Sequence, residues 1–429
     1  MLAAALPPLF LHARYSPGFS LGSGSTSVSV ELADLAVLAV VVFAAAAARK
    51  DASPLRGGGS VWLTGGVFLG LVFASTAYGP FVTDGYSLGA GAISAAKFAE
   101  YALLTAAVPL LLRSRHDWWP FFVVLTGWAL AATGWGLLQF LGLVDEFEGR
   151  RPGQRETSFL GVHDFAALSA ATLALALLAL AFGGTRGRTA RTAVAAGVAG
   201  SLGVVLSGAI ATAAAVVAGA TVVATAALRR GAVSGRRAAA LTAVVLAVVA
   251  GTVAIRSADL GQLLRFVGIE KADEATSGQV QTYAHRTVLA YIGVRIFLDH
   301  PLLGVGWQGS ALDASYKPYL ADARARYPSV SEESLPSPEH RWGVQNAFVQ
   351  AAADMGVLGV LSLLALLAAG TATAAAAFRR GPTLALLPVV WLLVGAAELA
   401  ALGLFAGSPT DALLWLALGL AVASRRAPE

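Results

Sequence analysis

Long apolar stretches separated by short polar segments run along the whole chain. A bilayer-spanning helix needs about 20 mainly apolar residues. About eleven stretches meet this requirement, at 30–48, 59–79, 94–112, 118–141, 164–183, 190–207, 209–228, 238–255, 355–377, 383–403 and 410–424. The first eleven residues form an apolar stub, which would raise the number to twelve if it entered the membrane. The pattern therefore predicts an all-α, polytopic integral membrane protein with about 11–12 transmembrane helices.

The composition supports this fold class and excludes several others. Hydrophobic residues make up 57% of the 429 residues and charged residues 13%, whereas soluble domains carry about 25% charged residues. So few charges cannot cover a globule of this size in water. They also exclude a disordered chain, a coiled coil and a nucleic-acid-binding module. The chain has no cysteine, so disulfides, thiolate catalysis and cysteine-ligated metals are excluded.

Basic residues predict the orientation of the chain in the membrane. They gather in alternate short loops that hold few acidic residues. The groups are Arg49, Lys50 and Arg56; Arg113 and Arg115; Arg186, Arg188 and Arg191; Arg229, Arg230, Arg236 and Arg237; Arg379 and Arg380; and Arg425 and Arg426. Because cytoplasmic loops carry an excess of Lys and Arg, we expect these loops in the cytoplasm and the intervening loops outside.

Two longer polar segments are expected on the extracytoplasmic side. One covers about 145–164, and the other, 256–344, is the large loop of what we expect to be a single membrane domain, 1–429. Within the large loop, Val288, Leu289, Ile292 and Ile296 share one face of a predicted helix that ends before Pro301. We expect this loop to form short helices at the membrane surface. The cytoplasmic side has no comparable segment and no glycine-rich phosphate loop, so ATP-driven chemistry is not expected.

Three polar motifs lie in or beside these segments. They are RPGQRETSFLGVHDFAALSA at 151–170, DHPLLGVGWQGS at 299–310 with Arg286 upstream, and HRWGVQNAFVQAAADMGVLG at 340–359. In the third motif Asn346, Gln350 and Asp354 recur every four residues and would form a polar stripe on a helix. Taken alone, each motif also fits a plain structural role: an interfacial loop, a helix stop with a glycine turn, or a polar helix start.

Together the three motifs, over about 151–366, resemble the O-antigen ligase and O-antigen polymerase superfamily, with DHPLLGVG as the most specific element. The resemblance implies a glycosyltransferase of cell-envelope polysaccharide biosynthesis. Such an enzyme moves a glycan from a polyprenyl pyrophosphate, such as undecaprenyl pyrophosphate, to a hydroxyl of a glycan or lipid acceptor. The reaction takes place at the outer face of the cytoplasmic membrane, among membrane lipids, and is metal-independent. No cofactor and no nucleic-acid partner are expected.

The resemblance carries two arginines over to this chain as ligands of the pyrophosphate. Arg286 matches the arginine upstream of DHPLLGVG, and Arg155, with Arg151 as second choice, matches the arginine of the loop before the fifth span. The leaving pyrophosphate develops negative charge, which a divalent metal or fixed guanidinium groups must stabilise. No acidic pair typical of a metal site lies beside the motifs, whereas arginines do, and a guanidinium can bind phosphate in a bidentate manner.

The acceptor side is where the chain departs from the family pattern. Asn346 and Gln350 match the family's His-Asn-x-x-x-Gln signature, but Gln345 replaces the histidine. The resemblance implies that this histidine activates or holds the acceptor, and a glutamine cannot take a proton at neutral pH. His340, with Arg341 beside it, is the candidate catalytic substitute from the preceding segment. Alternatively, His340 is an ordinary solvated histidine.

Two further positions bear on the site. His163 and Asp164 could position an acceptor, or Asp164 could simply cap the following helix, because Asp is a favoured N-cap residue. In the segment 206–212 the family often has a Ser-Arg pair where this chain has Gly208 and Ala209. These departures leave open a diverged transferase or a catalytically inactive scaffold of the same fold.

A lipid-linked glycan transporter or flippase is the alternative from another class. Asp34, Lys97, Glu100 and Glu398 lie within predicted spans, where polar groups are costly and often functional. Lys97 and Glu100 are three residues apart, so they would neutralise each other on one helix face. The large one-sided loop favours an external active site over alternating access.

Overall fold

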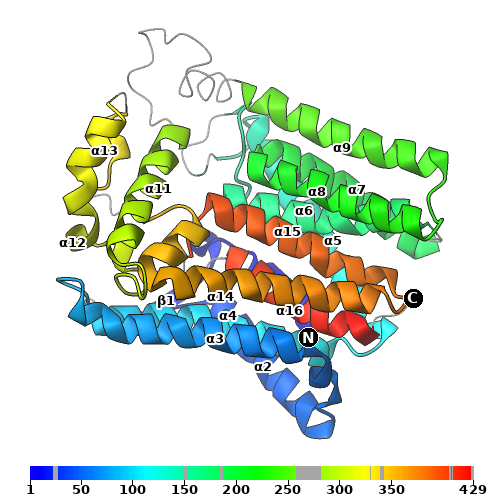
Figure 1. Ribbon diagram of the computed structural model, residues 1–429. Coiled ribbons are helices and arrows are strands. Elements are labelled where there is room, and N and C mark those ends of the chain that lie inside the picture. The colour runs from blue at the N-terminus through cyan, green and yellow to red at the C-terminus, as the bar shows by residue number, and fades with distance from the viewer. Residues whose placement is uncertain are drawn as a thin grey trace.

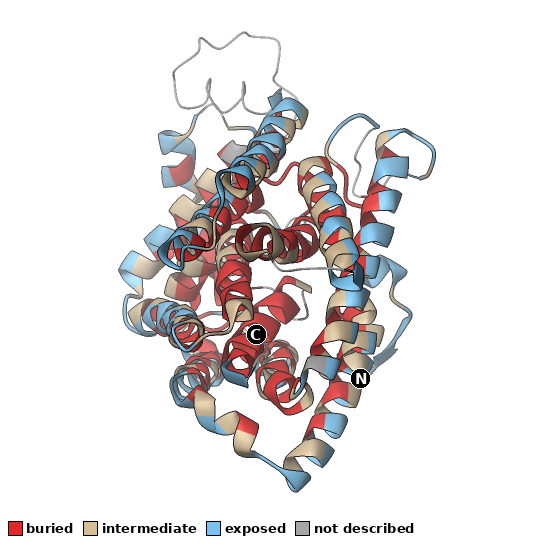
Figure 2. Ribbon diagram, turned by 90° about the vertical axis from the view of Figure 1, so that its right-hand side faces the viewer, coloured by how far each residue is buried: buried red, intermediate tan, exposed pale blue. Residues whose placement is uncertain are grey.

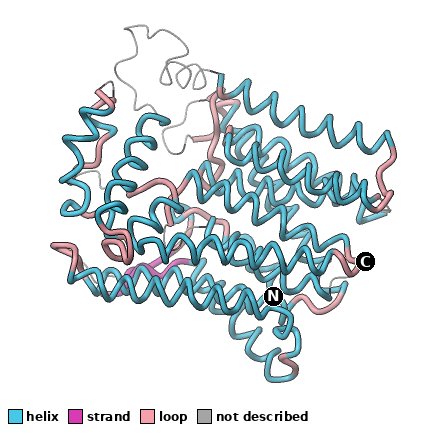
Figure 3. The backbone as a smooth tube through the Cα atoms, in the orientation of Figure 1, coloured by secondary structure: helices cyan, strands magenta, loops and turns pink. Residues whose placement is uncertain are grey.

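The protein is a bundle of long helices whose axes are roughly aligned (Figure 1). The computed structural model describes residues 1–22, 28–145, 147, 152–183, 187–257, 282–328, 330–338, 343–404, 407 and 409–426. Helices make up most of this part of the chain (Figure 3). Its strands form one antiparallel pair, β1 (Gly18–Leu21) and β2 (Val28–Glu31). The predicted all-α class is confirmed.

Ten helices of the described residues are long and apolar enough to cross a membrane. Their bounds are α2 Leu32–Lys50, α3 Gly59–Tyr78, α4 Leu88–Leu111, α5 Arg115–Phe140, α6 Val162–Phe182, α7 Gly187–Ser207, α8 Ile210–Arg229, α9 Gly235–Ile255, α14 Ala347–Phe378 and α15 Leu387–Ala401, which the 3₁₀ turn Thr383–Leu386 extends to a span of 19 residues. A helix satisfies its backbone hydrogen bonds internally, which is why apolar segments of this length adopt it in lipid. The polytopic character predicted from hydropathy is confirmed.

The predicted eleventh and twelfth spans are shorter than the other ten. The stretch 410–424 forms α16 (Pro409–Ala423), whose 15 residues extend about 22 Å, less than the roughly 30 Å of a bilayer core. All residues from Thr410 to Ala423 are buried by neighbouring helices, so protein rather than lipid surrounds α16. The N-terminal stub forms α1 (Leu2–Leu9), eight residues that contact α5 and α2.

The helices differ in how far the bundle encloses them. Buried residues gather in the centre when the bundle is seen from its end, and exposed residues line the outer helices (Figure 2). α6 and α16 are buried along most of their length, whereas α2 and α9 bury only a few residues each. Because α6 is central, the polar side chains at its start can meet residues from several other helices.

The described residues between α9 and α14 lie at one end of the bundle (Figure 1). They include α11 (Thr282–Asp299), α12 (Asp313–Tyr316) and α13 (Leu320–Arg326). The predicted apolar face of α11 is confirmed, since Val288, Leu289, Ile292 and Ile296 are buried. Three of the four pack in a small core with residues of α12 and α13. The basic turns after α8 and α14 lie at the opposite end of the bundle.

The motif at 299–310 has a structural role, because it packs against a break in α14. Gly356 has φ 67° and ψ −164°, outside the helical region. The backbone N–H groups of Val305 and Gly306 donate to the carbonyls of Ala353 and Asp354, each at 3.0 Å. The carboxylate of Asp354, fully buried, accepts from the N–H groups of Gln308 and Ser310 at 3.0 and 2.9 Å. The motif therefore fixes α11 to the start of α14.

The expected pairing of Lys97 with Glu100 is wrong. Lys97 of α4 instead forms an ion pair with Asp34 of α2, with 2.9 Å between Nζ and Oδ2. This ion pair neutralises both charges within the bundle. Because it joins two helices, it also links α2 to α4, which a pair within one helix could not do.

Candidate functional site

A chain of hydrogen bonds at the end of the bundle joins three of the candidate residues. Arg286 of α11 donates from Nε to Oε1 of Gln345, at 3.3 Å. Its Nη2 lies 2.9 Å from Nε2 of His163, the second residue of α6. A guanidinium can only donate, so Nε2 of His163 is the acceptor. The structure therefore brings Arg286, Gln345 and His163 together from three segments of the sequence.

The other nitrogen of His163 contacts a buried carboxylate. Nδ1 of His163 lies 2.6 Å from Oε2 of Glu398 in α15. Because Nε2 accepts from Arg286, the ring proton lies on Nδ1 and is donated to Glu398. The Thr212 hydroxyl of α8 donates to the second oxygen, Oε1. The Glu398 side chain is fully buried, whereas that of His163 is 18% exposed, so only the histidine is accessible.

The chain of hydrogen bonds continues on the other side of Gln345. Nδ1 of His285 donates to the carbonyl of Ser334 at 2.7 Å, and Nε2 lies 3.5 Å from Nε2 of Gln345. Burial lowers the pKa of His285, the carbonyl of Ser334 opposes this effect, and nearby Arg286 adds to it. A neutral His285 can accept from the amide of Gln345. The amide both donates and accepts, so Gln345 can link His285 to Arg286.

A pair of arginines, Arg155 and Arg256, lies at the turn between α7 and α8. Gly208 has φ 58°, and a Cβ added there would lie 3.1 Å from Cβ of Arg155 and 3.2 Å from Cδ of Arg256. Arg256, directly after α9, is 4% exposed. Its side chain thus occupies the space into which a side chain at position 208 would point. Thr212, in the first turn of α8, links this turn to Glu398.

Asn346 and Gln350 take part in the scaffold beneath this site. The Asn346 side chain caps α14, accepting from the N–H groups of Phe348 and Val349 at 3.1 Å, and donates to the carbonyl of Ala400. Gln350 is 2% exposed and donates to Asp354 at 3.0 Å. The expected stripe on one helix is therefore only partly present, since Asn346 precedes the helix.

The alternative interpretation of Asp164 as an N-cap is wrong. α6 begins at Val162, and its N-cap is Gly161, whose φ of 92° suits glycine. Asp164 lies in the first turn, where it accepts from the hydroxyl of Thr410 at 2.7 Å. His163 and Asp164 consequently point to different partners and form no pair with each other in these contacts.

Three candidates lie outside the described residues: Arg151, His340 and Arg341. Their proposed roles stay predictions. Among the residues that the structure describes, no group of three or more His, Asp or Glu side chains is arranged to hold a metal ion.

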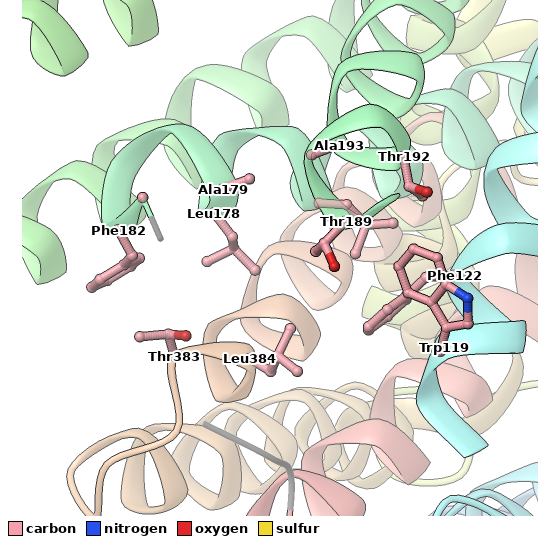
Figure 4. A pocket seen from close by; sticks show the side chains of 12 residues that line it. Trp119, Phe122, Leu178, Ala179, Phe182, Thr189, Thr192, Ala193, Thr383 and Leu384 are labelled. Atoms are coloured by element: carbon pink, nitrogen blue, oxygen red, sulfur yellow. The ribbon is translucent and has the colours of Figure 1, made fainter. Parts of the chain in front are cut away.

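A pocket lies far from this cluster, at the other end of α6 (Figure 4). Its volume is about 140 Å³, and its lining includes Trp119, Phe122, Phe182, Thr189 and Leu384. From Val162 to Phe182, α6 has 21 residues and is therefore about 30 Å long. The lining is mostly apolar, and the arginines described above are absent from it. The pocket is therefore separate from the hydrogen-bonded residues around Arg286.

Sequence reasoning missed four residues in or beside this hydrogen-bonded chain: His285, Thr212, Arg256 and Glu398. Glu398 had a signal, because a lone carboxylate in an apolar span needs a partner, but the sequence pattern linked it only to transport. His285 precedes Arg286 directly, but a histidine beside an arginine is not informative by itself. Thr212 and Arg256 had no signal, since their role depends on which helices are neighbours.

Part of the chain resembles a known protein family. No curated protein matches the chain. Residues 171–364 match the family described as O-Antigen ligase. The matched range includes Arg286 and Gln345, while Arg155, His163 and Glu398 lie outside it. The match confirms the resemblance drawn from the motifs: this polytopic membrane protein is similar to the O-antigen ligase superfamily, which indicates O-antigen ligase-type glycan transfer in a membrane.

Proposed function

We propose that the protein transfers or polymerises a glycan carried by a polyprenyl pyrophosphate. The acceptor is a hydroxyl group of a glycan or lipid, and no metal ion takes part. The observation that carries the proposal is the placement of Arg286: Gln345 and His163 hold its guanidinium at the end of the bundle, inside the range that matches the O-antigen ligase family.

The chemistry of the leaving group explains why arginines are needed. When the acceptor oxygen attacks the anomeric carbon, the bond from that carbon to the pyrophosphate breaks and the electron pair stays on the phosphate oxygen. Guanidinium groups stabilise this charge and can bind two oxygens at once. Arg286 is the principal ligand, and Arg155 with Arg256 forms a second basic pair over Gly208.

The site belongs to the extracytoplasmic side in this proposal. Loops rich in Arg and Lys end the helices at the opposite end of the bundle, and such loops are cytoplasmic as a rule. The segment with α11, α12 and α13 then covers the outer face of the cytoplasmic membrane. The isoprenoid tail would remain among the helices, and the pyrophosphate would reach Arg286 at the surface.

The acceptor side includes His163 and Gln345 in this proposal, together with His340 and Arg341. Asn346 and Gln350 support it from beneath, since their amides hold α14 and the neighbouring backbone. A glutamine at 345 is compatible with activity because its amide orients Arg286.

The test uses purified protein in nanodiscs with a polyprenyl-pyrophosphate-linked glycan, candidate acceptors and EDTA. Transfer should proceed in EDTA and fall in Arg286→Ala. A hydrogen bond to a charged group contributes about 1.5–3 kcal/mol. Two such bonds to phosphate are lost, so the rate should fall by about 10²- to 10⁴-fold. Arg295→Ala is the matched control on the same helix; Arg295 is 44% exposed and lies near Asp322, and this variant should stay within twofold of wild type.

Loss of transfer in EDTA that magnesium restores would refute metal independence. Equal activity of Arg286→Ala and Arg295→Ala would refute the assignment of the pyrophosphate site. The polar groups that suggested transport have partners within the bundle, since Lys97 pairs with Asp34 and Glu398 is bonded to His163 and Thr212.

A further inference from the structure

His163 has both ring nitrogens engaged, and by groups of opposite character. Nε2 accepts from the Arg286 guanidinium at 2.9 Å, and Nδ1 donates to Glu398 at 2.6 Å. The directions of these two bonds define a neutral imidazole with its lone pair at Nε2. This lone pair faces the guanidinium of Arg286, which binds the pyrophosphate in the proposed function.

Glu398 is placed to support a proton on that lone pair. Burying an unpaired carboxylate is costly, so a fully buried Glu398 needs partners, and His163 and Thr212 supply them. In a catalytic triad, a buried carboxylate holds the histidine in one tautomer and stabilises the imidazolium that forms during reaction. Glu398 and His163 have the same relationship, and the Thr212 hydroxyl fixes the orientation of the carboxylate.

We propose that His163 is the general base that activates the acceptor hydroxyl, with Glu398 as its positioning residue. This inference rests on the proposed function. Nε2 of His163 removes the hydroxyl proton while the acceptor oxygen forms its bond to the anomeric carbon. The bond to the pyrophosphate breaks, its electron pair leaves on the phosphate oxygen, and the proton on His163 passes afterwards to the leaving group or to water. His163 thus does what Gln345 cannot.

Arg286 makes this base dependent on the donor. In the structure its Nη2 covers Nε2 of His163. A pyrophosphate attracts the guanidinium more strongly than a neutral imidazole does, because the hydrogen bonds are then charged on both sides. When Arg286 turns to the donor, Nε2 becomes available to the acceptor. Donor binding and acceptor activation are therefore coupled through one side chain.

Other ionisable groups lie on the elements packed around α6. They are Arg155 and Glu156 before α6, Asp164 within it, Arg256 after α9, His285 in α11 and Asp411 in α16. His285 is the other histidine of the cluster, but its Nδ1 is bonded to a backbone carbonyl and Nε2 faces Gln345. His163, by contrast, places Nδ1 on a carboxylate, that of Glu398.

The first experiment measures binding of radiolabelled undecaprenyl pyrophosphate in nanodiscs between pH 5.5 and 8. This compound is the leaving group, so its complex resembles the state in which His163 holds the acceptor proton. Binding should take up a proton, and the affinity of wild type relative to His163→Gln should rise by up to about tenfold per pH unit as the pH falls. Because wild type and His163→Gln bind the same ligand, protonation of the pyrophosphate affects both affinities equally and drops out of their ratio. His116→Gln, at the opposite end of the bundle, should behave as wild type.

The second experiment measures glycan transfer in membranes that contain the native donor and acceptor. His163→Gln should lower the rate by about 10²- to 10⁴-fold, the usual contribution of a general base, while still binding undecaprenyl pyrophosphate. Glu398→Gln keeps the shape of the side chain and should also lower transfer and flatten the pH dependence of binding.

The outcomes separate the two proposals. If wild type does not bind undecaprenyl pyrophosphate, the proposed function fails. If wild type binds but His163→Gln shows the same pH dependence, the assignment of the base is overturned, whatever the transfer rate. The assignment of the base is also overturned if His163→Gln binds undecaprenyl pyrophosphate and transfers glycan at the wild-type rate.

Discussion

Gly356 provides a sharp test of how the site is held in place. Its φ of 67° and ψ of −164° are accessible almost only to glycine. A Cβ at this position would lie 2.2 Å from the carbonyl carbon and oxygen of Leu302 and 2.6 Å from the nitrogen of Leu303. Gly356→Ala must therefore separate α14 from the segment that follows α11.

The expected loss of stability follows from the contacts at this junction. The strained backbone of an alanine costs about 1–3 kcal/mol. Three backbone hydrogen bonds cross the junction: Val305 N to Ala353 O, Gly306 N to Asp354 O, and Val357 N to Pro301 O at 2.8 Å. Each contributes about 0.5–1.5 kcal/mol net. The total is about 2.5–7.5 kcal/mol, a large part of the roughly 5–15 kcal/mol that stabilises a typical fold.

The assay is thermal unfolding in detergent, followed by size-exclusion chromatography. Gly356→Ala should lower Tm by about 5 °C or more. It should also lower transfer, because Gln345 and Arg286 lie on the two segments that the junction joins. Gly66→Ala in α3 is the matched control, since a Cβ there meets nothing within 4 Å. A Tm of Gly356→Ala equal to that of Gly66→Ala would refute the reasoning.

Two further predictions concern Gln345 and His285. Gln345→Leu should lower kcat/KM by about 10- to 100-fold, because Arg286 loses a hydrogen bond that contributes about 1.5–3 kcal/mol. Gln345→His should keep most of the activity, because histidine can also donate and accept. A fully active Gln345→Leu would contradict this role. The pKa of His285 is lowered in the folded protein, whereas an unfolded chain has the ordinary histidine pKa of about 6.5. Below this pH the unfolded chain therefore binds more protons at this residue than the folded protein does. The free energy of unfolding should therefore decrease as the pH is lowered below about 6.5, by at most about 1.4 kcal/mol per pH unit. Tm should drop less between pH 7.5 and 5.5 in His285→Gln than in wild type, and equal drops would contradict the prediction.

Local sequence patterns predicted the helices well. The apolar face of α11 was predicted from the spacing of Val288, Leu289, Ile292 and Ile296, and all four are buried. Asp299 ends α11 as Pro301 indicated. Hydrophobic length and helical periodicity are properties of neighbouring residues, so a single sequence contains them. The short α16 was less predictable, because its burial by other helices cannot be judged from its own composition.

The partners of the polar residues were decided by tertiary structure alone. His163 and Glu398 are 235 residues apart, and Arg286 and His163 are 123 apart. A carboxylate in an apolar helix must find a donor, but the sequence does not say which helix provides it. Lys97 illustrates the same point, since its partner is Asp34 of α2 rather than the nearby Glu100.

The sequence by itself determined that the chain crosses a membrane many times, that its basic loops share one side, and that its motifs resemble the O-antigen ligase superfamily. The packing of α6, α8, α11 and α15 decided that His163, Thr212, Arg286 and Glu398 form one hydrogen-bonded chain. The physical reason is that hydrophobicity selects each helix locally, whereas hydrogen bonds between helices depend on which helices become neighbours.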